Sequence, residues 1–546
     1  MTVRPLAFAL LAASVVTLGA QQRAPGIDSI RQDDLRADLF FLAGDAMRGR
    51  LTDTVENVAT GDYIRARFER AGLKAAAPGG SYFQNYHLMT ATLGEGNALE
   101  VSGGDGVVRR LHHGQEFYPQ RFSASGTATG AVVFAGFGIT APKQGHDDFA
   151  GDVQGKIALV LDHEPGERDP KSAFEGVVTS EPSTPWRKAL AAQARGAVAV
   201  LFVADVHNHP APVNVEQAAR AVWPAAAPHL KTYMLSAWAD RLRIPSAQIS
   251  PALAASLVAG TGKSLVELAT AAEAARATTV LPLPGARVTL TTAVDRHTIP
   301  DRNVVGLIEG SDPVLKDEWV LVTAHFDHNG TDGAQIYNGA DDNGSGTVAL
   351  LEIADAYAEA ARAGRRPKRS VLFAAWNSEE RGLLGAWAYT EFPLAPLSTI
   401  AAVLNMDMIG RNEEVEVGGG PRFNGLDVQT AESNANTLNM MGASRAPDLA
   451  AAMMAANAGI GLTLLPRYEN NASNLVRRSD QWPFLQRGVP ALGFMTGLHP
   501  DYHTVYDRPE KINYPKMEKI ARLVYQASWD LANAAGRPAH ATETVK

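Results

Sequence analysis

Residues that can bind metal ions follow several short apolar segments of this sequence. The candidates are His325, Asp327, Glu379, Glu380, Asp407 and His503. Continuous apolar segments of this length are typical of buried strands, and in an open α/β sheet the carboxyl ends of neighbouring strands meet at one edge. Their polar side chains can therefore converge. Two histidines and several carboxylates are the nitrogen and oxygen ligands that two zinc ions would need.

A glycine-rich turn adds two more carboxylates between the first of these strands and the helix after it. Residues 338–346 read Asn-Gly-Ala-Asp-Asp-Asn-Gly-Ser-Gly and contain Asp341 and Asp342. Aspartates are common in such turns, and a pair such as Glu379-Glu380 is common at a helix start because it favours the helix dipole. Each motif alone is weak evidence. Their occurrence at successive strand ends is what indicates a metal site.

The elements that must position these residues are apolar strands that alternate with helices. Continuous apolar strands with helical crossovers predict a mostly parallel, twisted α/β sheet covered by helices on both faces. The expected strands are 319–324, 370–376, 400–406 and 489–495, and the expected helices include 347–363 and 382–390.

The length of the chain predicts more than one hydrophobic core. At 546 residues it exceeds the size of one ordinary domain. Residues 126–280 differ from the rest in being a shorter mixture of strands and helices. We therefore expect one discontinuous domain, 21–125 with 281–546, interrupted by an inserted α/β domain at 126–280.

The N-terminus has the layout of a secretory signal peptide. Arg4 is the only charge before Arg23, and the apolar residues 6–18 are followed by the small residues Gly19 and Ala20. The apolar run is shorter than the roughly 20 residues of a membrane span, although an uncleaved anchor is the alternative interpretation. We expect residues 1–20 to be removed and the protein to be exported, periplasmic or extracellular, with no further membrane span.

Composition excludes several classes of protein. With 46% hydrophobic and 20% charged residues, the chain is not mostly disordered. A net charge of -8 gives no indication of a nucleic-acid or anionic-membrane partner. There is no cysteine, which excludes disulfides, thiolate ligands and a cysteine nucleophile. Nor does any serine lie in a Gly-x-Ser-x-Gly elbow with triad partners.

Other histidines have weaker support as ligands. By their spacing, His207 and His209 could bind a metal ion, but a loop without metal is the favoured interpretation. His499 either lines the pocket or has a structural role in its loop. These weaker candidates are His112, His113, His207, His209, His328 and His499.

Five motifs together resemble the co-catalytic zinc peptidases of clan MH. Within that clan the chain is similar to the family of bacterial leucyl aminopeptidases and glutamate carboxypeptidase. The resemblance covers the order and spacing of the motifs between about 300 and 515, and it extends to residues 45–50. The motifs lie at 325–327, 339–346, 378–382, 405–408 and 502–504. Segments 130–139 and 153–157 are similar to the protease-associated domain that many members carry as an insertion.

The resemblance implies a site for two zinc ions. Asp342, at the second acidic position of its motif, would bridge them. His325 and Asp407 would complete one site, and Glu380 and His503 the other.

Two further carboxylates receive roles from the same resemblance. Glu379 would be the general base, and Asp327 would orient His325. Residues 479–481 read Ser-Asp-Gln where family members often have Ser-Asp-His. Because Asp480 is kept, we expect this difference to affect substrate specificity or the residues that support the site, and not the metal ligands.

The leading hypothesis is an exported dizinc exopeptidase, an aminopeptidase that removes N-terminal residues from peptide substrates. A carboxypeptidase or dipeptidase of the same fold is the main alternative, and it would need an arginine such as Arg411 or Arg467 in the pocket. A glutaminyl-cyclase-like acyl transferase would use a single zinc ion. A non-catalytic binding protein is disfavoured because all five ligand positions are filled. The sequence carries no signal for an oligomeric state.

Overall fold

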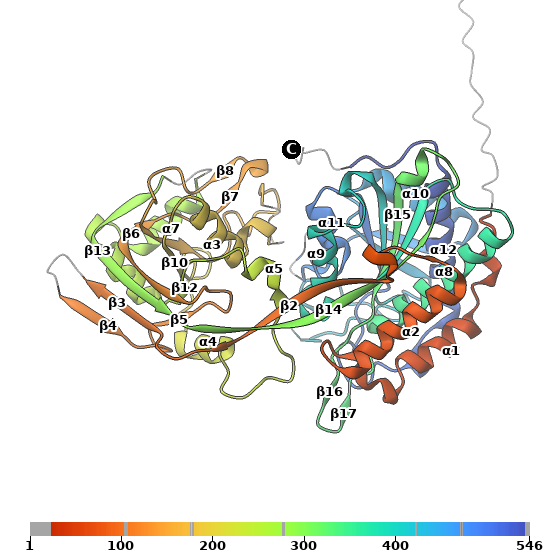
Figure 1. Cartoon of the computed structure of the whole chain (residues 1–546), viewed down its shortest axis with the longest axis horizontal. Coiled ribbons are helices and arrows are strands. Elements are labelled where there is room, and N and C mark those ends of the chain that lie inside the picture. Colours follow the sequence, from red (N-terminus) through yellow and green to blue (C-terminus); the bar gives the residue numbers. More distant parts are fainter. Residues whose placement is uncertain are drawn as a thin grey trace, which may run out of the picture.

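The computed structural model describes residues 23–102, 107–174, 176, 179–275, 279–420, 423–469, 471 and 473–540. Its elements form two lobes, each built on its own large sheet (Figure 1). The first lobe contains a ten-stranded sheet and the second an eight-stranded sheet. The expected signal peptide, residues 1–20, lies outside the described residues.

The first lobe has a mixed sheet, and its parallel core carries the candidate ligands. The four central strands β18, β15, β19 and β22 run parallel, whereas β14 and β20 flank them in the antiparallel sense. The α/β prediction is confirmed, but parallel pairing is restricted to these four strands and to β20 with β21. In spatial order the strands are β11 (Met234–Leu235), β2 (Phe83–Leu93), β14 (Val294–Ile308), β18 (Ser370–Trp376), β15 (Trp319–His325), β19 (Ile400–Met406), β22 (Ala491–Met495), β20 (Thr437–Met441) and β21 (Thr463–Pro466), with β1 (Lys74–Ala75) beside β14.

Helices cover both faces of this sheet, as the apolar strands predict. Alternate residues of β15 point to opposite faces. Val320 and Val322 therefore join one apolar core and Leu321 joins another. On the first face lie α1 (Gln32–Leu42), α2 (Val55–Ala71), α8 (Gly346–Arg362), α10 (Pro447–Ala456) and α12 (Tyr514–Asn533); on the second lie α9 (Leu384–Glu391) and α11 (Gln481–Gln486).

The second lobe has its own sheet and cores. Strands β6, β9, β10 and β12 run parallel in its centre. In spatial order its strands are β4 (Val108–Leu111), β3 (Ala98–Ser102), β13 (Leu281–Thr292), β6 (Gly126–Phe134), β9 (Ile157–Leu161), β10 (Ala199–Val203), β12 (Ser246–Ile249) and β5 (Phe117–Pro119). Its helices are α3 (Pro185–Ala194), α4 (Val215–Val222), α6 (Pro251–Val258) and α7 (Leu265–Glu273). A small hairpin of β7 (Thr140–Ala141) and β8 (His146–Asp147) also belongs to this lobe. A second small hairpin, β16 (Thr331–Asp332) with β17 (Gln335–Ile336), lies between β15 and α8 of the first lobe.

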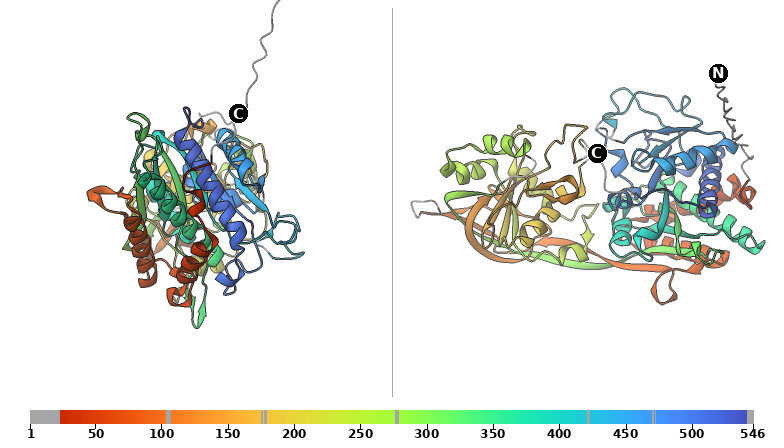
Figure 2. Two further views of the ribbon diagram at one scale, coloured as in Figure 1. Left: turned by 90° about the vertical axis from the view of Figure 1, so that its right-hand side faces the viewer. Right: turned by 90° about the horizontal axis from the view of Figure 1, so that it is seen from above.

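One antiparallel ribbon joins the lobes. Strands β2 and β14 pair along their length in the first lobe, and the chain continues from them into β3 and β13 of the second. The ribbon is visible along one side of both lobes (Figures 1 and 2). The second sheet therefore draws on strands on both sides of the expected boundaries at 126 and 280. Strands β3 and β4 are short and half polar, so the sequence does not indicate that they belong to the sheet of the second lobe.

Aromatic and charged side chains connect the lobes directly. Trp238, on the short helix α5 (Ser236–Ala239), stacks on Trp186 of α3 at 4.6 Å and meets the edge of Trp387 of α9 at 5.8 Å between ring centroids. Beside them, Glu181 contacts Arg487 at 2.8 Å, and Arg187 contacts Glu391 at 3.1 Å. The lobes thus share a packed interface as well as a ribbon.

Among the residues that the structure describes, no single helix is long and apolar enough to cross a membrane. One bent pair of helices, 251–261 with 265–273, satisfies length and composition together. Leu253, Leu257 and Leu268 of this pair are packed in the core of the second lobe.

Replacing Trp238 by alanine should destabilise the protein, because the ring is 7% exposed and fills the space between the lobes. We expect a loss of about 3–5 kcal/mol in the free energy of unfolding, measured by urea titration. Val314, which is 74% exposed, supplies the control, and its replacement by alanine should change stability by about 0.5 kcal/mol or less. Equal effects of the two substitutions would contradict a packed interface at Trp238.

Candidate metal centre

The candidate ligands converge at one edge of the first sheet. His325 is the last residue of β15 and lies opposite Trp376, the last residue of β18. Glu379 and Glu380 follow β18 closely, and Asp407 directly follows β19. The carboxyl ends of these parallel strands therefore deliver their side chains to the same place, as the sequence predicts.

The first group of ligand atoms comprises His325, Asp342 and Asp407. The Nε2 atom of His325 lies 3.4 Å from Oδ1 of Asp342 and 3.4 Å from Oδ1 of Asp407. All three residues are buried and offer ligand atoms within 4.8 Å of one another. One imidazole nitrogen and two carboxylates at this spacing are suited to one zinc ion.

The second group lies on the other oxygen of Asp342. The Nε2 atom of His503 is 2.9 Å from Oδ2 of Asp342 and 3.3 Å from Oε2 of Glu380. His328 also reaches this group, with Nδ1 2.7 Å from Oε1 of Glu380 and 3.9 Å from Oδ2 of Asp342. His328 is fully buried, and neither ring nitrogen makes a well-directed hydrogen bond to a described residue. Sequence reasoning gave it little weight, since its position after Asp327 was its one signal.

Asp342 faces both groups, whereas its neighbour Asp341 points elsewhere. The Asp341 carboxylate accepts a hydrogen bond from the backbone N–H of Gly410 at 2.6 Å and lies 3.2 Å from Nε2 of His499. The structure therefore places His499 beside Asp341, outside both ligand groups. The donor set around Asp342 fits two zinc ions that share one carboxylate.

Side chains from other segments fix the turn that carries Asp342. The carboxylate of Asp507 accepts the backbone N–H groups of Asp341 and Asp342 at 2.9 and 3.1 Å. Asn343 donates from Nδ2 to the carbonyl of Met406 at 2.9 Å. Asn343 thereby ties the turn to the end of β19, which precedes Asp407.

Glycine is required at the start of this turn. Gly339 has φ of +57°, a conformation that other residues rarely adopt. A Cβ atom there would lie 2.2 Å from the carbonyl oxygen of Asp342 and 2.5 Å from the His328 ring. The close approach of backbone and ring thus depends on the glycine.

Asp327 chiefly holds the backbone of the two glutamates. Its Oδ1 accepts the N–H of Glu379 at 3.0 Å, and its Oδ2 accepts that of Glu380 at 3.3 Å. Its Oδ1 is 3.6 Å from Nδ1 of His325, which lies nearer to the backbone oxygen of Asp327, at 3.3 Å. Residue Asp327 thus orients His325 mainly through its backbone, and its carboxylate positions Glu379 and Glu380.

A buried polar network supports the same strand end. Ser378 has φ of +59° and donates from Oγ to Oδ2 of Asp301 at 2.6 Å. The side chains of Asn57 and Asn377 exchange two hydrogen bonds, at 2.8 and 2.9 Å. Sequence reasoning missed Asp301 and Asn57 because neither belongs to a local motif; both reach the site only through the fold.

Arg50 joins the loops around the site. Its guanidinium donates to the carbonyls of Leu42, Phe326, Asn338 and Gly339 at 2.7–2.8 Å. Burial lowers the pKa of Arg50 to about 10, so the side chain keeps its charge at neutral pH. This contact explains why the segment 45–50 accompanies the ligand motifs.

Electrostatics within the first group favour positive charge. Burial acts to lower the pKa of His325, yet the Glu379 and Asp407 carboxylates raise it well above its ordinary value. Burial raises the pKa of Glu379 well above its ordinary value. The carboxylates therefore stabilise a cation at His325, and they would stabilise a divalent ion in the same way.

The carboxylates of the second ligand group likewise stabilise positive charge. Burial opposes protonation of His503, but Glu380 and Asp342 raise its pKa to about 10. Burial also acts to raise the pKa of Glu380, while the rings of His503 and His328 hold it well below its ordinary value. The group is thus suited to hold a positive ion beside Asp342 and Glu380.

A cavity opens onto the candidate ligands. Asp342, Glu379, Asp407 and His503 line its floor, and its wall is largely apolar. The wall residues are Met408, Met441, Leu475, Met495, Leu498 and Tyr502, with Arg478 and Ser479.

The arginine in this cavity is Arg478, which the sequence did not single out. Its guanidinium donates to the hydroxyl of Tyr502 at 2.9 Å. The two arginines considered from the sequence lie elsewhere: Arg411 pairs with Asp501 at 3.0 Å, and Arg467 pairs with Glu413. Neither is among the residues that line the cavity.

Residues 479–481, where Gln481 replaces the histidine often found in the family, contact the strand β19 that precedes Asp407. Gln481 is buried and accepts a hydrogen bond at 3.2 Å from Nδ2 of Asn405, which also donates to Ser479 at 2.9 Å. Burial raises the pKa of Asp480 well above its ordinary value. These residues brace β19 just before Asp407.

Comparisons with known proteins find relatives that match part of this chain. A probable glutamate carboxypeptidase of Arabidopsis thaliana is 30% identical over 213 residues, 38% of this chain and 26% of that protein. A glutamate carboxypeptidase 2 homolog of Caenorhabditis briggsae is 28% identical over 239 residues, 41% and 29% of the two chains. The chain thus spans less than a third of the length of these relatives.

Solved structures with detectable similarity include two bacterial enzymes. An aminopeptidase from Aneurinibacillus sp. strain AM-1 has a TM-score of 0.46 and 19% identity over 95% of this chain and 97% of that one. A zinc aminopeptidase from Bacillus subtilis has a TM-score of 0.43 and 18% identity over 92% and 95%. Residues 303–528, less than half of the chain, match Peptidase family M28, and this segment contains all the residues of the two ligand groups around Asp342. This part of the chain is therefore similar to Peptidase family M28.

Proposed function

We propose that the protein is an exported dizinc exopeptidase that removes N-terminal residues from peptides. The observation that carries the proposal is the convergence of two ligand groups on Asp342, with Glu379 beside them. The match of residues 303–528 to Peptidase family M28 and the similarity to a protein described as a probable zinc metalloprotease support the coarser assignment to zinc metallopeptidases.

The ligands would divide between two sites that share Asp342. His325 and Asp407 would complete the first site, and Glu380 and His503 the second. When bound, zinc supplies Lewis acidity toward the scissile carbonyl and toward water. The protein contributes a buried, pre-arranged set of donors, because Asp327, Asp507 and Asn343 fix their backbone.

Glu379 would act as the general base. Its Oε2 lies 3.8 Å from Nε2 of His325, and the residue lines the cavity. From this position the carboxylate can accept a proton from the attacking water and return it to the leaving amine. Burial raises the pKa of Glu379 well above its ordinary value, and the positive ions proposed beside it would act in the opposite direction.

The cavity supports an apolar residue at the cleavage position. Its wall includes Met408, Met441 and Leu475. The carboxylates on its floor are committed to the proposed zinc ions and to the general base, so they do not decide between a substrate ammonium and a substrate carboxylate. Arg478 is the observation that favours the second candidate, a carboxypeptidase or dipeptidase, because a guanidinium there could bind a substrate carboxylate in a bidentate manner.

Export and the nature of the second lobe belong to the same proposal. Arg4 and the apolar residues 6–18 support a signal peptide. Mass measurement on protein recovered from outside the source cells should find residues 1–20 absent. The second lobe would be a protease-associated domain, on the basis of segments 130–139 and 153–157.

Replacing Glu379 by glutamine should lower kcat by about 10²–10⁴-fold, since loss of a general base has this effect. Zinc content should stay at the wild-type value, because the proposed ligands remain. Activity on an aminoacyl chromogenic substrate and metal analysis of the same sample measure both quantities. Glu416→Gln, at an exposed glutamate, is the control. Near-normal turnover of E379Q would remove the assignment.

His503 and His328 should differ in their effect on zinc content. His503 lines the cavity, whereas His328 is buried behind Glu380 and is not among the lining residues. We expect H503Q to lose one zinc ion per chain and H328Q to retain both with weaker affinity. Metal analysis after dialysis against buffered zinc distinguishes the two. The reverse pattern would assign the second site to His328.

Blocked peptides should reveal the direction of cleavage. Chelation should abolish hydrolysis and added zinc should restore it, because the donors fit zinc. Acetylation of the substrate N-terminus should then prevent cleavage, while amidation of its C-terminus should not. A leucine at the first position should be removed faster than a glutamate. Cleavage of acetylated peptides together with resistance of amidated ones would favour the carboxypeptidase.

A further inference from the structure

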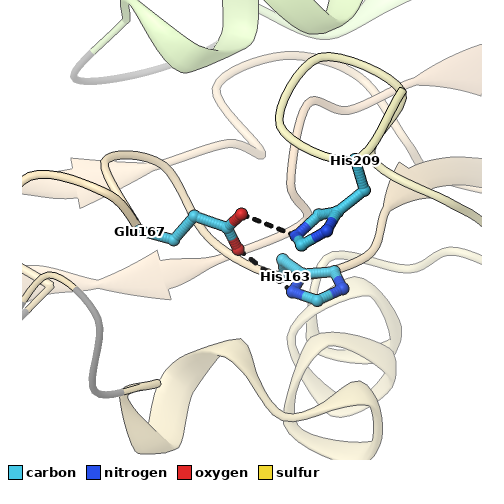
Figure 3. A group of neighbouring side chains, drawn as sticks. All are labelled: His163, Glu167 and His209. Atoms are coloured by element: carbon cyan, nitrogen blue, oxygen red, sulfur yellow. Dashed lines mark ion pairs between the residues drawn. The ribbon is translucent and has the colours of Figure 1, made fainter. Parts of the chain in front are cut away.

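The second lobe contains a separate cluster of metal-binding side chains. His163, Glu167 and His209 point toward one another (Figure 3). The Nδ1 atom of His163 lies 3.1 Å from Oε2 of Glu167, and Nε2 of His209 lies 2.6 Å from Oε1. The ligand atoms of all three residues lie within 4.8 Å of one another. None of the three lines the cavity of the metal centre in the first lobe.

The cluster occupies the place where parallel sheets bind ligands. His163 follows β9 by two residues, and His209 lies on the loop after β10. These strands are parallel neighbours, so their loops emerge at the same edge of the second sheet. The histidine that joins His209 in the cluster is His163. His207, although closer in sequence, lies with its Nδ1 atom 3.0 Å from Oγ1 of Thr270.

The backbone of His163 is held in an unusual conformation. It has φ of +64°, which few residues other than glycine adopt. The buried ammonium of Lys188 donates to the carbonyls of Leu161, at 2.8 Å, and of His163. Strained backbone that the surroundings stabilise in this way is characteristic of functional sites.

The other two ligands are fixed through one residue of α7. The carboxylate of Glu273 accepts the N–H of Gly166 at 2.8 Å and an amide N–H of Asn208 at 3.0 Å. Gly166 precedes Glu167 and Asn208 precedes His209, so the two loops are tied to the same carboxylate. Asp205, fully buried, accepts the backbone N–H of His207 at 3.0 Å and completes the loop.

We propose that His163, Glu167 and His209 form a binding site for a divalent transition-metal ion, with zinc as the natural occupant. Two imidazole nitrogens and one carboxylate are a ligand set that zinc uses in proteins, with a fourth position left to water or another ligand. The histidine side chains are 46% and 45% exposed and that of Glu167 is 15% exposed, so an ion can enter from solvent. A bound ion would cross-link the loops after β9 and β10.

The zinc content of the full chain tests the site. The comparison is a difference between a variant and the wild type, so it does not depend on how many ions the first lobe binds. After chelation and dialysis against micromolar zinc, the double variant H163Q/H209Q should hold one ion fewer per chain than the wild type. H207Q, which changes the neighbouring histidine, should hold the wild-type number. Equal zinc content in the wild type and the double variant would overturn the proposal.

A second measurement uses the wild-type chain and so does not depend on the folding of a variant. Diethyl pyrocarbonate modifies accessible imidazoles, and peptide mass spectrometry identifies the modified histidines. Zinc should protect His163 and His209 in wild-type protein and should leave modification of His207 unchanged. Unchanged modification of His163 and His209 on addition of zinc would overturn the site, whatever the zinc content of the first lobe.

Discussion

Burial of several carboxylates at one edge of a sheet is the constraint that shapes the first lobe. Asp327, Asp342, Glu379 and Asp407 are each less than a tenth exposed, with Glu380 beside them. An isolated buried carboxylate is strongly unfavourable unless it is paired or hydrogen-bonded. The chain offsets this with imidazoles, backbone N–H groups and the buried guanidinium of Arg50. Divalent cations are the remaining charge that such a set accommodates.

The structure separates the residues that face the ions from those that hold them in place. His325, Asp342 and Asp407 point into the site, while Asp301, Asp507 and Asn343 bind backbone or neighbouring side chains around it. Since each supporting residue comes from a different segment, the positions of the ligands depend on the whole first lobe. This agrees with the general finding that residues behind the ligands of a metal site tune their orientation.

The central strands were predictable because their signal is local. Residues 370–376 and 400–406 coincide with β18 and β19, and both end beside candidate ligands. Local patterns could not identify Asp301 or Arg478, since only the packing of distant segments brings them to the site. His328 is an intermediate case: it follows a predicted strand, but its burial against Glu380 cannot be seen in the spacing.

The second lobe shows the same limit on a larger scale. Its strands β9 and β10 are apolar and fall within the expected module, whereas β3 and β4 are short and partly polar and lie outside it. His209 was weighed with His207 because they are close in sequence. The fold instead pairs it with His163, which lies on a neighbouring strand end.

The ribbon of β2 and β14 makes the second lobe a topological detour. Leu93 and Val294 are paired partners, so the chain leaves the first sheet and returns to it at adjacent points. A tight hairpin turn could join the same two positions. The pairing of β2 with β14 therefore needs no particular length of chain between them. The inserted chain also returns to the first sheet once, where β11 pairs with β2 at the sheet edge, so the second lobe is anchored to the first at a second place.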